Sequence, residues 1–116
     1  MTIREIAETL DATWLCCEEE GDRALRTAFA SDMMSDVLAY VKDQAVLLTG
    51  LVNPQVVRTA EMMDMVCVVF VRSKMPTEEI VRLARESHMV ILATRKRMYE
   101  ACGKLYAAGL GVAHES

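Results

Sequence analysis

The sequence predicts an α/β fold, a single small domain with a mostly parallel sheet flanked by helices. Three apolar runs, at residues 44–49, 66–71 and 89–93, have the composition of buried strands. A helical pattern follows each run after a short connection, so the second half reads as strand then helix, three times over. That order implies parallel strands joined by right-handed crossovers. The length of 116 residues fits one domain, 1–116, whose residues 110–116 we expect to form a flexible tail.

The first 30 residues predict one helix and two strands. Thr2 and Glu5 form a capping-box pattern ahead of the apolar stripe of Ile3–Leu10. Residues 12–17 are short and apolar, and a polar, acidic turn separates them from an alternating segment at residues 23–30. These two segments are interpreted as hairpin-like strands that extend the sheet.

Four further helices are predicted from their start signals and apolar stripes. Ser31-Asp32 precedes the stripe that begins at Met34, and Asn53-Pro54 supplies a capping residue with proline at the first helical position. Pro76 is expected to start the third of these helices. Residues 95–108 form the last one, with Gly109 as its C-cap.

The composition excludes several classes of protein. Thirteen basic against 17 acidic residues give a net charge of −4, which argues against a nucleic-acid binder. No apolar run is long enough to cross a membrane, and the N-terminus lacks the pattern of a secretory signal, so we expect a cytoplasmic protein. The spacing of the cysteines fits no zinc site and indicates reduced, mostly buried thiols. The sequence predicts neither a metal nor a cofactor. The cysteines are Cys16, Cys17, Cys67 and Cys102.

Polar and basic residues follow the three strong strands. Because the carboxyl ends of parallel strands share one edge of a sheet, these residues are expected to gather there, beside helix N-termini that favour anions. The sequence therefore predicts a site for a small anion, although solvated loops of ordinary composition are the alternative interpretation. The candidate ligand-binding residues are Thr49, Asn53, Arg72, Ser73, Lys74, Thr94 and Arg95, and Lys96 and Arg97 add further charge.

A second polar cluster consists of Ser31, Asp32, Ser35 and Asp36. The two carboxylates lie four residues apart on one helical face, a spacing that suits a divalent cation or acid–base chemistry. Their place at a predicted helix start favours a capping role or an interface contact instead.

No catalytic constellation emerges from the sequence. The P-loop pattern and the Gly-x-Ser-x-Gly pattern are both absent. His88 lies between a predicted helix and a strand, where a structural role is the usual one, and His114 falls in the predicted tail. We therefore expect no enzyme activity.

The order and spacing of several short motifs resemble the DRTGG domain over nearly the whole chain. Where the family typically has a Thr-Gly-Gly-like turn, this chain has Phe70-Val71-Arg72-Ser73 and no glycine. Glycines there would let a ligand approach the backbone, whereas this chain carries a charged side chain. The motifs that carry the resemblance are Gly21-Asp22-Arg23, the two Ser-Asp pairs of residues 31–36, Asn53-Pro54-Gln55-Val56-Val57, the strand and threonine of residues 90–94, and Leu105-Tyr106 with Gly109-Leu110.

The resemblance implies a non-catalytic regulatory module. Such domains accompany enzymes such as phosphotransacetylases and inorganic pyrophosphatases, in the latter with adenine-nucleotide regulation and dimer contacts. We therefore expect a homodimeric domain that binds a small anionic ligand, such as a nucleotide or a phosphorylated metabolite. The alternative is a protein–protein interaction module that docks on a partner enzyme without a small ligand.

Overall fold

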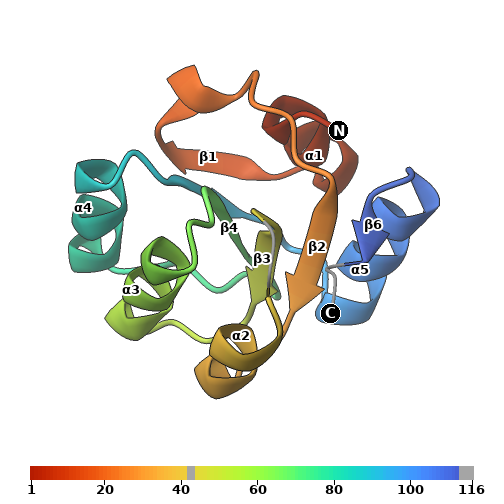
Figure 1. Ribbon diagram of the computed structural model, residues 1–116. Coiled ribbons are helices and arrows are strands. Elements are labelled where there is room, and N and C mark those ends of the chain that lie inside the picture. The colour runs from red at the N-terminus through yellow and green to blue at the C-terminus, as the bar shows by residue number, and fades with distance from the viewer. Residues whose placement is uncertain (42–43, 113–116) are drawn as a thin grey trace.

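The computed structural model describes residues 1–41 and 44–112 (Figure 1). Within them, six strands form one sheet in the order β1-β5-β4-β3-β2-β6. Strands β2, β3, β4 and β5 run parallel, and β1 pairs antiparallel with β5. The strands are β1 Thr13–Cys16, β2 Thr27–Ala30, β3 Val46–Thr49, β4 Cys67–Phe70, β5 Val90–Ala93 and β6 Gly111–Val112.

Helices cover both faces of the sheet, which confirms the predicted α/β architecture (Figure 1). Helices α2, α3 and α4 pack side by side on one face, and α1 packs against α5 on the other. The helices are α1 Ile3–Leu10, α2 Met34–Tyr40, α3 Pro54–Met62, α4 Glu78–Glu86 and α5 Met98–Ala107, with a short 3-10 turn, η1, at Glu18–Glu20.

The core consists of the central strands and the apolar stripes of the helices. Every residue of β3, β4 and β5 is buried, as expected for parallel strands covered on both faces. Cys16, Cys17 and Cys67 are buried, and burial raises the pKa of Cys17 to about 12 and raises that of Cys67 as well. No helix in the described part of the chain is long and apolar enough to span a membrane.

Local start signals predict α1 and α3 correctly. The Thr2 hydroxyl accepts a 3.1 Å hydrogen bond from the Glu5 N–H, and the Glu5 carboxylate accepts one of 2.7 Å from the Thr2 N–H. That backbone bond lowers the pKa of Glu5. Asn53 caps α3 and Pro54 is its first residue. The C-cap of α5 is Ala108 rather than the predicted Gly109, which comes directly after it with φ of +103°.

Three predicted helix starts are wrong by a few residues. Helix α5 begins at Met98 rather than at residue 95, with Arg97 as its N-cap. Helix α4 begins at Glu78 rather than Pro76, because the Thr77 hydroxyl accepts a hydrogen bond from the Ile80 N–H and caps it. Helix α2 begins at Met34, and its N-cap, Met33, makes no side-chain capping bond. The strand predicted at residues 23–30 is shorter, Thr27–Ala30.

The predicted hairpin-like pairing of the first two strands is wrong. β1 and β2 lie far apart in the strand order, with β5, β4 and β3 between them. The chain leaves β1 through η1, and Ala24 then forms an isolated bridge with Thr2, so the connection crosses beside α1 before β2 joins β3.

The folded domain extends further toward the C-terminus than predicted. Leu110 is buried, and Gly111–Val112 forms β6, which pairs parallel with β2. The predicted tail therefore does not include residues 110–112. The rest of it, with His114, lies outside the described residues.

Candidate functional site

Four parallel strands end at one edge of the sheet, and we call the segments that follow them the loop edge. These segments are residues 31–33, 50–53, 71–77 and 94–97. This is the edge where open α/β sheets bind ligands. The structure divides its polar residues into two groups, which lie on either side of the turn after β4.

The first group is held together by Asp32. Its carboxylate accepts a 3.0 Å hydrogen bond from the Thr49 hydroxyl and a 2.7 Å bond from the Gly50 N–H. The second carboxylate oxygen lies 3.7 Å from Nη2 of Arg72. We call this set of contacts the Asp32 latch. It connects the loops that follow β2, β3 and β4.

Gly50 lets the Arg72 guanidinium lie close to the backbone of the loop after β3. A Cβ atom at position 50 would collide with the Arg72 guanidinium, so only glycine leaves space for this contact. The arginine thus covers the backbone of its neighbouring loop, with its charge directed at Asp32.

Arg72 and Ser73 form the tight turn after β4. Their φ angles are +62° and +60°, and the Lys74 N–H donates a 3.2 Å bond to the Val71 carbonyl, which is the pattern of a type I′ turn. Neither residue is glycine, and the left-handed conformation costs about 1–2 kcal/mol for each. Two backbone bonds fix the turn to the loop after β5: Arg72 N–H to the Lys96 carbonyl at 2.8 Å, and Ser73 N–H to the Thr94 carbonyl at 3.1 Å.

The second group lines a hollow of about 550 Å³ at the end of β5, which we call the Arg95 hollow. Arg95 and Ser73 are exposed there. Among the described residues, no acidic side chain forms an ion pair with Lys74, Arg95 or Lys96. The charge of the lining therefore comes from Arg95. The lining residues of the hollow are Thr13, Ser73, Met75, Ala93, Thr94 and Arg95.

Several predicted site residues have structural partners instead. The Thr94 hydroxyl is buried and donates a 2.7 Å hydrogen bond to the Leu10 carbonyl. The Asn53 carboxamide oxygen accepts from the Gln55 N–H at 2.8 Å and caps α3. The Thr49 hydroxyl, fully buried, serves the Asp32 latch. The structure therefore brings Ser73, Thr94 and Arg95 together but places Thr49 and Arg72 in the other group.

The predicted cap at Ser31 and Asp32 is wrong. The Ser31 hydroxyl accepts a 2.9 Å bond from the Met33 N–H, which forms a local turn ahead of α2, and Asp32 reaches across to Gly50. Ser35 and Asp36 lie in the first turn of α2, where Asp36 suits the positive end of the helix. Among the described residues, no cluster of three or more metal-ligating side chains is present.

Sequence reasoning missed three residues of the hollow, Thr13, Met75 and Ala93, and the partners of Asp32. Thr13 reaches the hollow only because β1 pairs with β5, where it lies opposite Ala93. Met75 enters through the turn geometry of residues 71–74. The spacing of Asp32 carried no signal for its bond to Gly50, 18 residues away.

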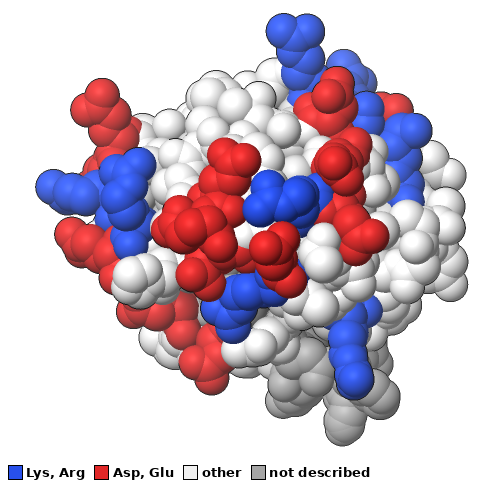
Figure 2. Space-filling view, turned by 90° about the horizontal axis from the view of Figure 1, so that it is seen from above, with Lys and Arg blue, Asp and Glu red and all other residues white. Residues whose placement is uncertain are grey.

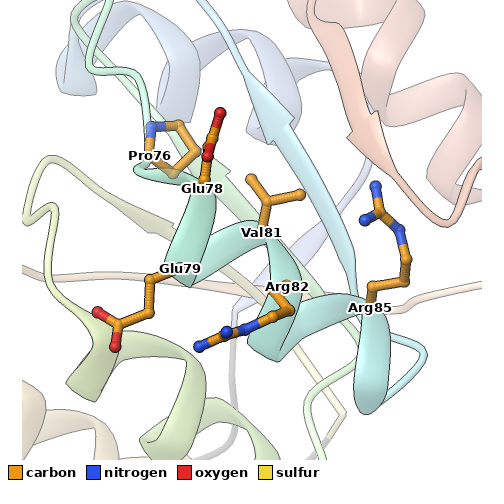
Figure 3. A pocket seen from close by; sticks show the side chains of 6 residues that line it. All are labelled: Pro76, Glu78, Glu79, Val81, Arg82 and Arg85. Carbon is orange, nitrogen blue, oxygen red and sulfur yellow. The ribbon is translucent and has the colours of Figure 1, made fainter.

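A larger hollow, of about 670 Å³, lies along α4, and none of the predicted anion residues lines it (Figure 3). Figure 3 shows Glu78 and Glu79 in the first turn of the helix and Arg82 and Arg85 further along it. Acidic residues at the start of a helix complement its dipole, so this mixture stabilises the helix and gives no preference for anions.

Acidic and basic side chains are interleaved where α1 and η1 lie (Figure 2). Arg4 forms ion pairs with Glu18 at 3.7 Å and Asp22 at 3.4 Å, and its guanidinium lies 5.5 Å from the centre of the Trp14 ring. Arg4 is therefore paired, whereas Arg95 has no acidic partner among the described residues.

Comparisons with known proteins give one family and one fold. The family model described as the DRTGG domain matches residues 5–108. No curated protein matches the sequence. The structure resembles that of the CBS and DRTGG domains of the regulatory region of Clostridium perfringens pyrophosphatase, solved with its activator, diadenosine tetraphosphate. The TM-score is 0.72 at 16% sequence identity. The match covers 97% of this chain and 48% of the pyrophosphatase chain, so this chain spans about half the length of that one.

Proposed function

This chain belongs to the DRTGG domain family, and from that premise we propose that it is a non-catalytic regulatory domain that binds a small anionic ligand in the Arg95 hollow. The observation that carries this proposal is an exposed arginine, without an acidic partner among the described residues, beside a serine hydroxyl in a hollow of about 550 Å³. A guanidinium with a neighbouring hydroxyl favours phosphate and carboxylate groups.

The ligand class we propose is a nucleotide or a phosphorylated metabolite. The structurally similar regulatory region of the pyrophosphatase binds diadenosine tetraphosphate, which supports a phosphate-bearing ligand for this fold. Lys74 and Lys96 directly follow the lining residues Ser73 and Arg95 in the sequence. Their charges would strengthen the attraction for a multiply charged anion.

A thermal-shift experiment tests this function. AMP, ATP and inorganic phosphate are compared with sulfate at matched ionic strength, because a ligand that binds the folded state raises its melting temperature. The proposal predicts that at least one phosphate compound raises the melting temperature of the wild type more than sulfate does. Equal shifts for all four would contradict it.

We also propose that the domain is a homodimer. Tyr99 and Tyr106 are 91% and 71% exposed on α5, and their spacing of seven residues places them on one face of the helix. An exposed aromatic face of this kind suits a protein contact. Light scattering after size-exclusion chromatography should give twice the chain mass.

The second candidate function is an interaction module that docks on a partner enzyme, with no small ligand. Three apolar side chains exposed near α2, Met33, Leu38 and Tyr40, favour it. Purification from the native host, where we propose a cytoplasmic location, should then recover a partner enzyme; recovery of the chain alone would contradict this function.

A further inference from the structure

We propose that the loop edge has a second anion position, and that the chain's own Asp32 fills it as an internal competitor of the ligand. The position is formed by the Thr49 hydroxyl, the Gly50 N–H and the Arg72 guanidinium, which we call the Thr49–Gly50 cradle. Its ligand class rests on the proposed function, since it would take a phosphate group of the same kind of ligand.

The donors of the cradle are those that bind oxyanions. A backbone N–H, a hydroxyl and a guanidinium converge on one carboxylate, at 2.7, 3.0 and 3.7 Å. Charge-assisted bonds of this type bind phosphate as well as carboxylate. Because Gly50 has no side chain, the guanidinium lies directly against the backbone that donates the amide.

Asp32 is held in a way that lets it be exchanged. Its side chain is 49% exposed and that of Arg72 is 46% exposed, so solvent screens their ion pair and leaves it weak. A phosphate dianion carries more charge than the carboxylate and is attracted more strongly to the same guanidinium. Access from solvent and the charge difference both favour exchange.

Exchange would loosen the start of α2. Asp32 lies two residues before this helix, whose N-cap has no side-chain bond and within which Val37 is the buried residue. With Asp32 displaced, the remaining apolar contacts of this segment with the core would be those of Val37, Val41 and the partly buried Met34. Ligand binding at the loop edge would thus reach the exposed side chains of Leu38 and Tyr40.

An NMR titration of the ¹⁵N-labelled full chain with inorganic phosphate tests the inference. Asp32→Ala removes the competitor, and Asp32→Asn removes its charge while keeping an oxygen that accepts from Gly50 and Thr49. We expect Asp32→Ala to bind phosphate at least fivefold more tightly than the wild type, with the Gly50 amide resonance shifting, and Asp32→Asn to lie between them. Dispersed spectra show that each variant folds. An unchanged affinity and an unmoved Gly50 resonance in both variants would overturn the inference.

Arg95→Ala separates this inference from the proposed function. Suppose that Arg95→Ala alone abolishes phosphate binding and that the Asp32 variants bind phosphate as the wild type does. The proposed cradle is then contradicted, and the proposed site in the Arg95 hollow is supported. If Asp32→Ala binds phosphate more tightly and the double variant with Arg95→Ala keeps this tighter binding, the cradle binds phosphate independently of Arg95. Hydrogen exchange supplies the test for α2: saturating phosphate should speed exchange in residues 34–40 of the wild type, and unchanged rates would overturn the coupling to this helix.

Discussion

The Thr94 hydroxyl donates a 2.7 Å hydrogen bond to the carbonyl of Leu10, the last residue of α1. A residue at the end of β5 thereby fixes the C-terminus of a helix 84 positions earlier in the chain. The bond is buried, and the carbonyl belongs to the group of terminal helix acceptors that have no partner within the helix. Thr94 therefore holds α1 against the sheet and does not offer its hydroxyl to a ligand.

Thr94→Val should lower the free energy of unfolding by about 1–3 kcal/mol, because it leaves the Leu10 carbonyl buried without a donor. Urea denaturation measures the change. Thr94→Ser is the matched control, since it keeps the hydroxyl and should lose less stability. A smaller loss in Thr94→Val than in Thr94→Ser would show that the methyl group, which valine keeps, stabilises this contact more than the hydrogen bond does.

Ser73→Gly should stabilise the domain by about 0.5–1 kcal/mol. Position 73 has a φ of +60°, where glycine avoids the steric cost that serine bears, and the relief exceeds the extra chain entropy of glycine. Ser73→Ala keeps the strain and serves as the control in thermal denaturation. A melting temperature of Ser73→Gly at or below that of Ser73→Ala would contradict the turn assignment.

Asn53→Ala should cost about 1 kcal/mol of stability and leave anion affinity unchanged, because the side chain caps α3 through the Gln55 N–H. Asn53→Asp retains a capping oxygen and should keep most of the stability. Denaturant unfolding and phosphate titration of both variants check this. Weaker phosphate binding by the alanine variant at unchanged stability would instead place Asn53 at the ligand.

Stability should fall as the pH rises above about 9. Burial raises the pKa of Cys17 from 9.0 to about 12 and also raises that of Cys67, so the unfolded chain loses these protons at lower pH than the folded chain does. The stabilisation is complete below pH 9 and is lost progressively as the pH approaches 12. Unfolding of Cys17→Ala between pH 8 and 11 should show a shallower decline than that of the wild type. Parallel declines would rule out a contribution from Cys17.

Local sequence patterns predicted most helices and strands, whereas the composition of the candidate site depends on long-range pairing between strands. The buried runs of β3, β4 and β5 were evident because strands covered on both faces are continuously apolar. The pairing of β1 with β5 could not be predicted, because a short apolar strand carries no signal for its partner. β6 was missed because two exposed residues have no pattern.

The anion residues show the same division. Their gathering at one edge followed from the parallel order of the strands, but the separate roles of Arg72 and Arg95 did not. Those roles depend on the turn at residues 71–74, which directs Arg72 across Gly50 and brings Ser73 into the hollow beside Arg95. Two consecutive left-handed residues without glycine are not expected from sequence.

The most direct test of the proposed function is phosphate binding by Arg95→Ala, followed by isothermal titration calorimetry or NMR shifts. The control is Arg58→Ala, an exposed arginine on α3 away from the hollow and without an ion pair among the described residues. The proposal predicts at least a tenfold loss of affinity for Arg95→Ala and none for Arg58→Ala. Equal affinity of the wild type and both variants would contradict an anion site in the Arg95 hollow.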